Sequence, residues 1–331
     1  MIKYLIFRTD RIGDFIFSRV LTQAIKKKNS KNIIDIVCSK YNHDYIKKYK
    51  DIRNIYPFDK YDPLLLVKNF LKINNENYDY IIILDGKRRS LFYSIFLKSK
   101  YKIAVLKDFR PSIFLRLFFD KYFINTEFND QYYNFSILCN YLHLVIPNKI
   151  NYFESHVILK DKYKTLTKGA LMLHLDEKWF EGLYHHDYKY MNLNYQNFNF
   201  LIKNIFKKFK KNIIITTGTR KIKELDKIIN LYFQKKNDNL YYSKKYFKKL
   251  IFIQKSSFLE LESIAKNCKI IICCEGAISH VSHALKVNTI ALVNKNNLET
   301  ALYWTNHMDQ VRLVYRDKLK EVCRQINKVQ F

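Results

Sequence analysis

Short, mostly apolar runs alternate with segments of helical periodicity along the first 107 residues. Strands are predicted for the runs at 2–7, 32–39, 54–58, 78–86 and 101–106. Between them, apolar side chains recur at helical spacing over 15–28, 41–50, 62–73 and 88–99. Strands that are apolar almost throughout are typical of a parallel sheet with helices on both faces. The pattern therefore predicts an α/β domain.

This alternation stops after residue 107 and resumes near residue 170. Residues 111–145 are aromatic and mostly helical in pattern, whereas 146–168 are polar, aperiodic and contain Pro147. We place a boundary in the second segment and predict domains at 1–155 and 165–331. A chain of 331 residues is long enough for two domains of roughly 150 residues, each with its own core.

The second half repeats the pattern of the first. Strands are predicted at 170–175, 212–218, 250–254, 269–276 and 288–294, and helices at 195–209, 220–235, 258–267 and 278–286. Ser257 and Glu260 have the spacing of a capping box at the start of one helix. The tail 316–329 is predicted to be a last helix, for which packing back on the first domain is an option. Two parallel sheets in tandem imply a cleft between them.

The chain is strongly basic, with 59 Lys and Arg against 30 Asp and Glu and a net charge of +29. This charge suits an anionic partner such as a phosphate, an acidic glycan, a nucleic acid or a membrane surface. It also fits the coding bias of an AT-rich genome, because Lys, Asn, Ile, Tyr and Phe are abundant. Charge alone therefore does not identify the partner.

The cysteines and the apolar segments indicate a cytoplasmic protein. Six Cys are present and none forms a C-x-x-C pair, which fits reduced thiols better than disulfides or zinc. The first apolar run ends at once at Arg8, so we expect no signal peptide. No run of about 18 uncharged apolar residues predicts a spanning helix.

Several chemistries lack their motifs. The sequence has no G-x-x-x-x-G-K-[ST], no G-x-G-x-x-G and no G-x-S-x-G, which disfavours P-loop, dinucleotide and hydrolase sites. It has no Asp-x-Asp pair to hold a metal against a diphosphate. The histidines at 280 and 283, and those at 185 and 186, lack a matching set of zinc ligands. We therefore expect no metal.

Two polar clusters remain, each at the carboxyl end of a predicted strand, where open α/β sheets bind ligands. The first is the charged loop that contains Arg8, Asp10, Arg11 and Asp14. The second begins at Glu275 and continues as Gly276, Ala277, Ser279 and His280, where a helix start would offer N–H groups to a diphosphate. An ordinary strand–helix junction is the alternative for the second cluster.

Three segments together resemble family 9 glycosyltransferases, the heptosyltransferases of lipopolysaccharide core synthesis. "IFRTDRIGDFIFSRVLTQAIKKK" resembles their opening, in which R-x-D-x-[IL]-G-D joins a strand to a helix. "YDYIIILDGKRRSLFYSIFL" is similar to their next signature, and the block from 256 to 293 is similar to their carboxy-terminal one. The order and spacing of the three segments span nearly the whole chain.

The resemblance implies a GT-B arrangement of two Rossmann-like domains, with parallel sheets facing across a cleft, and inverting transfer from a nucleotide-diphosphate sugar. Asp14 would be the general base, and Gly13 would turn the backbone so that Asp14 points into the cleft. Arg8 and Arg11 would hold an anionic acceptor or orient the base, and Arg89 would bind the acceptor. The alternative for Asp14 is a carboxylate that complements the dipole at a helix start.

On the donor side, the resemblance implies that Lys178 and the turn 275–280 hold the leaving diphosphate in place of a metal. The donor-binding set is Lys178, Glu224, Glu275, Gly276, Ala277, Ser279 and His280, with Glu224 on the nucleotide ribose. ADP-heptose is one candidate donor, and no resident cofactor is expected. The sequence departs from the family at "HLDE" before Lys178, at Glu275-Gly276-Ala277 and at "NKNNLE" after the last strand.

The implied function is transfer of a sugar to a lipopolysaccharide core or another surface glycan, with an anionic glycolipid as acceptor. Alternatives are a GT-B transferase with another sugar nucleotide and a catalytically silent scaffold. A nucleic-acid partner is disfavoured because no known module is present. The apolar segment 111–124, with Lys107, Arg110 and Lys121, predicts either a core helix or a contact with the inner face of the cytoplasmic membrane.

Overall fold

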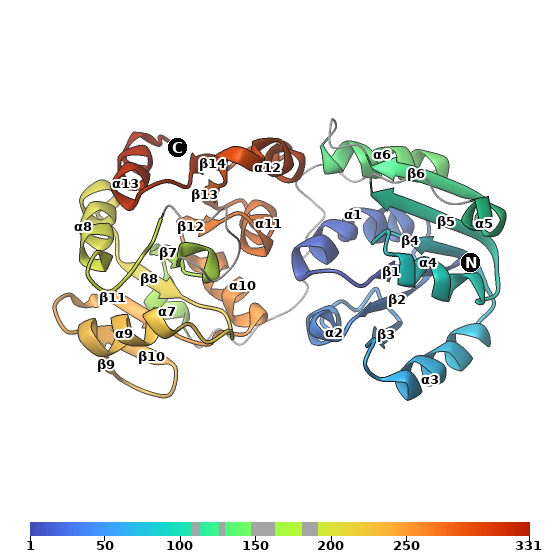
Figure 1. Cartoon of the computed structure of the whole chain (residues 1–331), viewed down its shortest axis with the longest axis horizontal. Helices are drawn as coiled ribbons and strands as arrows, with labels where there is room; N and C mark the ends of the chain where they lie inside the picture. The colour runs from blue at the N-terminus through green and yellow to red at the C-terminus, as the bar shows by residue number, and fades with distance from the viewer. Residues whose placement is uncertain (108–112, 126–129, 147–162, 181–190) are drawn as a thin grey trace. The chain divides into compact units, whose positions relative to one another are not determined.

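The computed structural model of the chain divides into two compact units, residues 1–157 and 158–331. Figure 1 shows one sheet with its helices in each unit. The structure describes residues 1–107, 113–125, 130–146, 163–180 and 191–331. No helix among these residues is long and apolar enough to cross a bilayer.

The first unit is built on a parallel sheet of six strands in the order β3-β2-β1-β4-β5-β6. The strands are β1 Lys3–Arg8, β2 Ile33–Ser39, β3 Asn54–Phe58, β4 Tyr78–Ile83, β5 Ser99–Lys107 and β6 Lys121–Asn125. The helices are α1 Ile12–Lys28, α2 Lys40–Ile46, α3 Pro63–Asn74, α4 Arg88–Ile95, α5 Ile113–Phe118 and α6 Gln131–Tyr141.

Helices cover both faces of this sheet, as the apolar strands predict. On one face, Leu5 and Phe7 of β1 share a cluster of buried side chains with Ile73 of α3 and Leu91 of α4. On the other face, α1 contacts both α2 and α6. Residues that alternate along β1 therefore pack against different helices.

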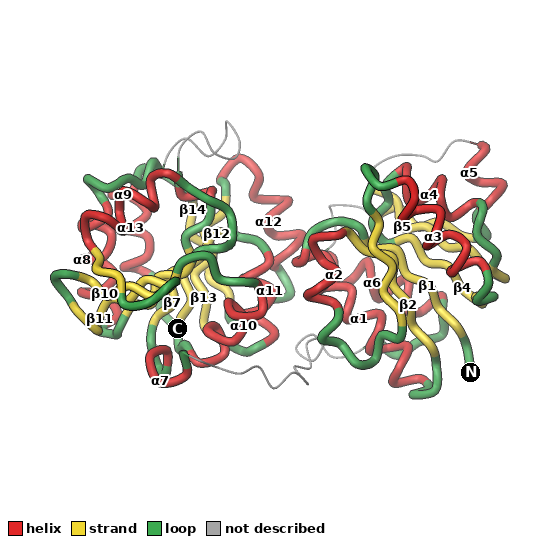
Figure 2. The backbone as a smooth tube through the Cα atoms, turned by 90° about the horizontal axis from the view of Figure 1, so that it is seen from below, coloured by secondary structure: helices red, strands yellow, loops and turns green. Residues whose placement is uncertain are grey.

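The second unit has eight strands in the order β14-β13-β12-β7-β8-β11-β10-β9, visible as the yellow layer of that unit in Figure 2. The parallel strands are β7 Leu171–His174, β8 Ile213–Thr216, β11 Phe247–Ile253, β12 Ile270–Cys274, β13 Asn288–Val293 and β14 Val311–Tyr315. At one edge, β9 Phe233–Lys235 and β10 Leu240–Ser243 extend the sheet in antiparallel register.

The helices of the second unit are α7 Lys164–Thr167, α8 Phe198–Phe209, α9 Lys223–Tyr232, α10 Phe258–Asn267, α11 Ala277–Ala284, α12 Leu298–Thr305 and α13 Leu319–Lys328. The last helix, α13, packs on α8 and β14. Its apolar side chains, from Leu319 to Ile326, belong to the core of the second unit.

The prediction of a mostly helical segment over 111–145 is wrong in part. Helix α5 ends at Phe118, and Lys121–Asn125 form β6, which pairs in parallel with β5. The hydrogen bonds offered by the edge of β5 decide this conformation, and a local pattern of side chains does not show them. The predicted lipid-contacting helix 111–124 is therefore not one helix, and Arg110 lies outside the described residues.

Candidate functional site

Arg8, at the end of β1, forms hydrogen bonds with the start of α1 and with the residue that follows β4. Its side chain is 2% exposed although it carries a charge. Nη1 donates to the carbonyl oxygen of Leu84 at 2.7 Å, and Nε donates to that of Asp14 at 3.0 Å. Nη2 also lies 3.7 Å from Oδ1 of Asp14. Of the two roles predicted for Arg8, orienting Asp14 fits this geometry.

Asp14 is the third residue of α1 and keeps 15% of its side chain exposed. Its Oδ2 accepts the backbone N–H of Arg11 at 3.1 Å. This bond satisfies one of the N–H groups that a helix start leaves without a partner. The carboxylate thus has the capping role of the alternative interpretation, and it remains accessible for a reaction.

The predicted role of Gly13 in the turn is wrong. Gly13 is buried inside the first turn of α1, in helical conformation, so it needs no freedom that other residues lack. The chain turns at Arg11 instead, which is extended with φ −90° and ψ 166°.

The two other cations predicted for the acceptor are both exposed. Arg11 presents its side chain at the start of α1. Arg89 lies in α4, where its guanidinium carbon is 5.9 Å from the centre of the Phe58 ring. The structure brings Arg8 and Asp14 together, but no contact joins Arg89 to either of them among the described residues.

Sequence reasoning missed a second network at this edge, centred on Asp85. The carboxylate of Asp85 accepts hydrogen bonds from the N–H and the hydroxyl of Thr9 and from the hydroxyl of Ser90. Nζ of Lys87 donates to the carbonyl oxygen of Thr9 at 3.0 Å. The polar run "LDGKRRS" after the strand is the signal that points to this network.

Asp10 is a buried carboxylate within the same loop. Its Oδ1 lies 3.3 Å from Nε of Arg8, and its side chain is 9% exposed. Burial raises the pKa of Asp10 to about 6, and the nearby Arg8 opposes part of this rise. The folded protein therefore holds a proton on Asp10 at a pH where the unfolded chain has lost it.

We expect Asp10→Asn to stabilise the fold near pH 8 and to have little effect near pH 4. Because the pKa of Asp10 rises from 3.8 to about 6 on folding, the wild-type protein loses stability as pH increases through that window. The Asn side chain does not ionise, so the variant should be more stable than wild type by about 3 kcal/mol at pH 8. Thermal unfolding of both proteins from pH 4.5 to 8 measures the gain. A variant that is less stable than wild type at pH 8 would show that Arg8 outweighs burial.

In the second unit, Lys178 reaches the start of α11. Lys178 follows β7 in a short 3₁₀ helix, Glu177–Trp179, and its N–H donates to Oδ1 of Asp176 at 3.0 Å. Its Nζ donates to the carbonyl oxygen of Glu275 and lies 3.2 Å from Oε1 of the same residue. Two segments 97 residues apart in sequence thus meet at one sheet edge.

Gly276 has a conformation that side chains strongly disfavour, with φ 153° and ψ −157°. Its N–H donates to Oγ of Ser279 at 3.3 Å, and that hydroxyl donates back to the carbonyl oxygen of Gly276 at 2.6 Å. A Cβ atom placed on Gly276 would lie 3.7 Å from Nζ of Lys178. Glycine here keeps the backbone open beside the ammonium group, and α11 begins at the next residue, Ala277.

Glu275 lies between two cations. One oxygen faces Lys178, and the other, Oε2, lies 3.7 Å from Nη2 of Arg316. Arg316 follows β14 and is 6% exposed. Sequence reasoning missed Arg316 because it did not predict β14. The carboxyl ends of β7, β12 and β14 therefore supply one cluster of a carboxylate and two cations.

His280 packs inside the unit. It is 4% exposed, and its ring meets that of Trp304 edge-on with 5.8 Å between ring centres. Trp304 belongs to α12, a helix that the sequence pattern did not predict. This position makes His280 part of the packing between α11 and α12.

Burial changes the protonation of two side chains beside Lys178. The pKa of Asp176 rises to about 6 because the carboxylate is buried, although Lys178 opposes the rise. The pKa of His174 falls to about 4 through burial and the charge of Lys178. His174 pairs through Nδ1 with the hydroxyl of Thr216 at 3.0 Å. Near pH 7, His174 is therefore neutral and adds no charge beside Lys178.

Glu224 lies apart from this cluster, in the first turn of α9. Its Oε1 is 2.6 Å from Nζ of Lys227. Glu224 also lines a hollow of about 720 Å³ between the segments that follow β7 and β8. The other residues that line it are Phe180, Asn192, Leu193, Asn194, Tyr195, Gln196, Lys221, Ile222 and Lys223. Its volume lies within the range of small-molecule binding sites.

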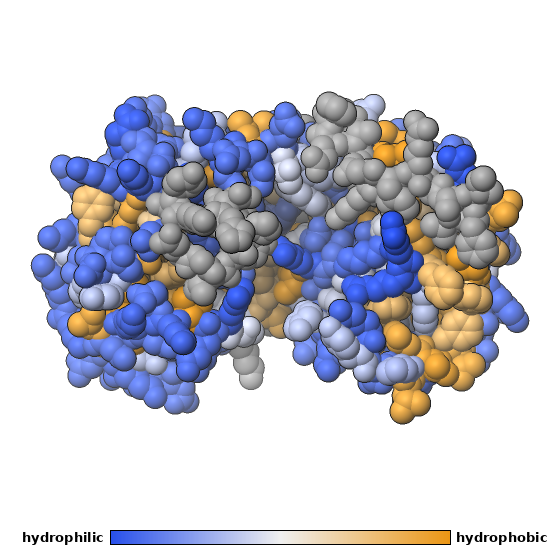
Figure 3. All heavy atoms as spheres, in the orientation of Figure 1, coloured by the Kyte–Doolittle hydropathy of each residue, from blue (hydrophilic) through white to orange (hydrophobic). Residues whose placement is uncertain are grey.

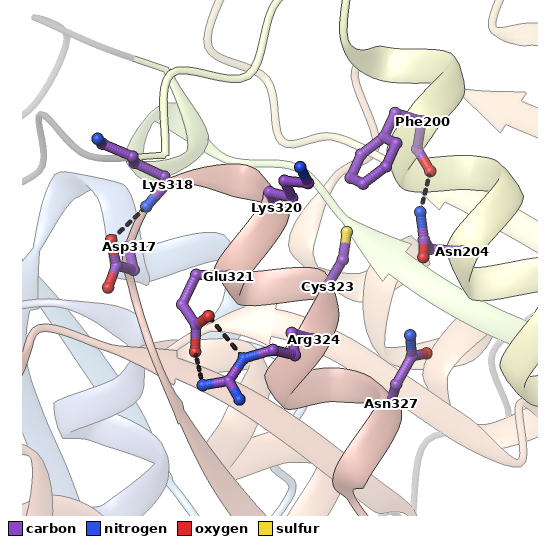
Figure 4. Close-up of a pocket in the computed structure, with 9 residues that line it drawn as sticks. All are labelled: Phe200, Asn204, Asp317, Lys318, Lys320, Glu321, Cys323, Arg324 and Asn327. Atoms are coloured by element: carbon purple, nitrogen blue, oxygen red, sulfur yellow. Dashed lines mark hydrogen bonds and ion pairs between the residues drawn. The ribbon is translucent and has the colours of Figure 1, made fainter.

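Another hollow, of about 500 Å³, lies between α8 and α13. Figure 4 shows the ring of Phe200 beside Cys323 and the paired Glu321 and Arg324 on the same helix. None of the predicted site residues lines this hollow between α8 and α13. Within the described ranges, no group of three His, Cys, Asp or Glu side chains could hold a metal ion.

No family model and no curated protein sequence matches the chain. Solved structures do match it over nearly its whole length. Heptosyltransferase WaaC of E. coli with ADP-2-deoxy-2-fluoro heptose is 11% identical, with a TM-score of 0.70, and covers 99% of this chain and 98% of its own. A family 9 glycosyl transferase from Veillonella parvula is 12% identical, with a TM-score of 0.69 and coverage of 95% and 86%.

A more distant likeness joins the chain to UDP-GlcNAc 2-epimerase from Methanocaldococcus jannaschii, at 15% identity and a TM-score of 0.58, with coverage of 99% and 94%. At these identities the likeness establishes the fold. The chain has the α/β fold of the GT-B class, with a parallel sheet in each unit, which confirms the predicted fold class.

Proposed function

We propose that the protein is an inverting glycosyltransferase of the family 9 type, which transfers a sugar from a nucleotide-diphosphate sugar to a surface glycan. One observation carries the proposal: Nζ of Lys178 lies beside Gly276 at the start of α11, where a diphosphate would meet both. The motif resemblance and the chain-long likeness to a heptosyltransferase structure that contains an ADP-sugar support it.

The leaving diphosphate would bind between Lys178 and the first turn of α11. The first N–H groups of a helix have no acceptor within the helix, and the helix dipole favours an anion there. Lys178 supplies a compact positive charge. When Lys178 pairs with the diphosphate instead of Glu275, Glu275 still has Arg316 as its partner and can accept hydrogen bonds from the donor. Charge on the leaving group is thus stabilised without a metal ion.

Asp14 would remove the proton from the acceptor hydroxyl, whose oxygen then forms a bond to the anomeric carbon as the bond to the diphosphate breaks. Arg8 holds Asp14 in place through the carbonyl and the carboxylate of that residue. The exposed Arg11 and Arg89 would contact anionic groups of the acceptor. This single displacement inverts the anomeric configuration.

A heptose carried by ADP is the donor that the family resemblance favours, and a lipopolysaccharide core is the matching acceptor. An acceptor of this kind is an anionic glycolipid, so the reaction would take place at the cytoplasmic face of a membrane. Glu224 and the hollow that it lines would hold the nucleoside part of the donor. The alternatives are another sugar nucleotide and a silent scaffold.

A thermal-shift screen against ADP-, GDP- and UDP-sugars tests the proposal. A ligand that binds only the folded state stabilises it by about 2.7 kcal/mol at 100 times its dissociation constant. We expect one nucleotide class to raise the melting temperature by several degrees. A rise with a UDP-sugar alone would favour the other-donor alternative. No rise with any sugar nucleotide would contradict the proposal, and binding without transfer would identify a scaffold.

We expect transfer activity to persist in excess EDTA. Lys178 and the start of α11 would neutralise the diphosphate, so removal of divalent cations should change the rate by less than about twofold. The measurement compares initial rates in EDTA with rates in added Mg²⁺ or Mn²⁺. A complete loss that either cation restores would mean that the diphosphate site has been misassigned.

A further inference from the structure

The outer side of α3 carries an exposed apolar stripe. Leu64, Val67 and Leu71 are 83%, 59% and 58% exposed. On a helix with 3.6 residues per turn these positions fall within about 60° of one another. The buried Asn69 and Ile73 lie on the opposite side, toward the sheet. An amphipathic helix normally buries its one apolar stripe, so a second stripe that faces solvent needs a partner.

Helix α4 extends this apolar surface. Phe92 and Phe96 are 59% and 57% exposed, and their ring centres are 5.2 Å apart. Tyr93 joins the two helices, because its hydroxyl donates to the carbonyl oxygen of Leu66 at 3.0 Å. Figure 3 shows the resulting group of hydrophobic atoms, in orange, over the position of α3 and α4 in Figure 1.

Basic side chains border this surface. Lys68 and Lys72 lie next to the stripe on α3, about 40° and 80° around the helix from Leu64. Both are exposed, and neither forms an ion pair with any residue that the structure describes. Arg88 and Lys98, also exposed, flank the two phenylalanines along the chain.

We infer that the exposed sides of α3 and α4 form a docking surface for a membrane that contains anionic lipids. Apolar side chains bordered by cations match an interface in which acyl chains lie beneath negatively charged headgroups. A second copy of this chain would bring the same lysines together on two molecules of charge +29, which like-charge repulsion opposes. The inference rests on the proposed function only in placing the reaction at a membrane.

Cosedimentation with lipid vesicles tests the inference without any sugar donor. We expect the protein to bind vesicles of phosphatidylcholine and phosphatidylglycerol, and to bind vesicles of phosphatidylcholine alone much more weakly. Replacing Leu64, Val67 and Leu71 together by Ser should lower partition at least about tenfold. The double change Lys68→Gln and Lys72→Gln should lower it roughly 25-fold, because each lysine near an anionic surface contributes about fivefold.

Matched controls come from the second unit. Phe200, Leu231 and Leu302 are 41%, 52% and 39% exposed, and their replacement by Ser removes apolar side chains from other surfaces. Lys266→Gln with Lys269→Gln removes two exposed charges. We expect both controls to bind vesicles as wild type does, and all variants to keep the wild-type melting temperature.

Four results would overturn the inference: no binding of wild type to anionic vesicles, full binding by either α3 variant, an equal loss in the controls, or a dimer in sedimentation velocity that the serine variant abolishes while vesicles are not bound. The sugar-nucleotide screen fails or succeeds separately, since no vesicle is present in it.

Discussion

Asp14→Asn is expected to lower turnover by about 10²- to 10⁴-fold and to leave donor affinity nearly unchanged. Removal of a general base costs a reaction about this much, because the acceptor hydroxyl must then lose its proton to water. Asn keeps an oxygen that can accept the N–H of Arg11, so the start of α1 should survive the change. The substitution therefore separates the reaction from the capping role.

The measurements are the initial rate of sugar transfer, the donor-induced shift in melting temperature and the melting temperature itself. Asp44→Asn is a matched control, because that carboxylate belongs to α2, is 89% exposed and makes no contact with Arg8. A variant with near-wild-type turnover and a lower melting temperature would show that Asp14 only caps α1 and is not the general base.

Lys178→Ala is expected to lower both kcat and the affinity for donor, with a loss in kcat of about 10²-fold. The ammonium group should bind the diphosphate more tightly as negative charge develops on it, so its removal acts on the transition state as well as on the bound donor. Glu275 retains Arg316 as a neighbour in the variant, which limits the structural damage.

Steady-state kinetics with varied donor measures both quantities, and Lys266→Ala serves as a control that removes an exposed charge from the same unit. Lys178→Arg should recover part of the rate, since it restores the charge in a different shape. An unchanged kcat with a raised KM for the donor would mean that Lys178 binds the donor equally in the ground state and in the transition state.

The fold could be predicted from the sequence because its central strands are apolar almost throughout, which is typical of a parallel sheet covered on both faces. The same reasoning brought Lys178 and Gly276 together in advance, since each follows a parallel strand and such strands end at a common edge. In the structure, Nζ of Lys178 donates to the carbonyl oxygen of Glu275, the residue that precedes Gly276.

Two edge strands, β6 and β14, were not predicted, and Arg316 of the site was missed with β14. β14 reads "VRLVY", in which polar and apolar residues mix, and β6 reads "KYFIN"; both are held by hydrogen bonds from a neighbouring edge. Arg316 reaches Glu275 only because β14 lies where it does. The packing of His280 on Trp304 likewise depends on α12, whose position no local pattern shows.

The buried guanidinium of Arg8 should limit local opening at the start of α1. Helix ends usually fray, and their amide hydrogens exchange with solvent through local opening. If the first turn of α1 opens in this way, Arg8 loses its contacts with the carbonyl oxygen and the carboxylate of Asp14 while its charge stays buried. The loss of these contacts makes local opening unfavourable. Arg8 also holds the end of β4 through Leu84. The amide hydrogen of Phe15, which donates to the carbonyl oxygen of Arg11 at 3.1 Å, should therefore exchange as slowly as those of the central strands, through global unfolding of the unit.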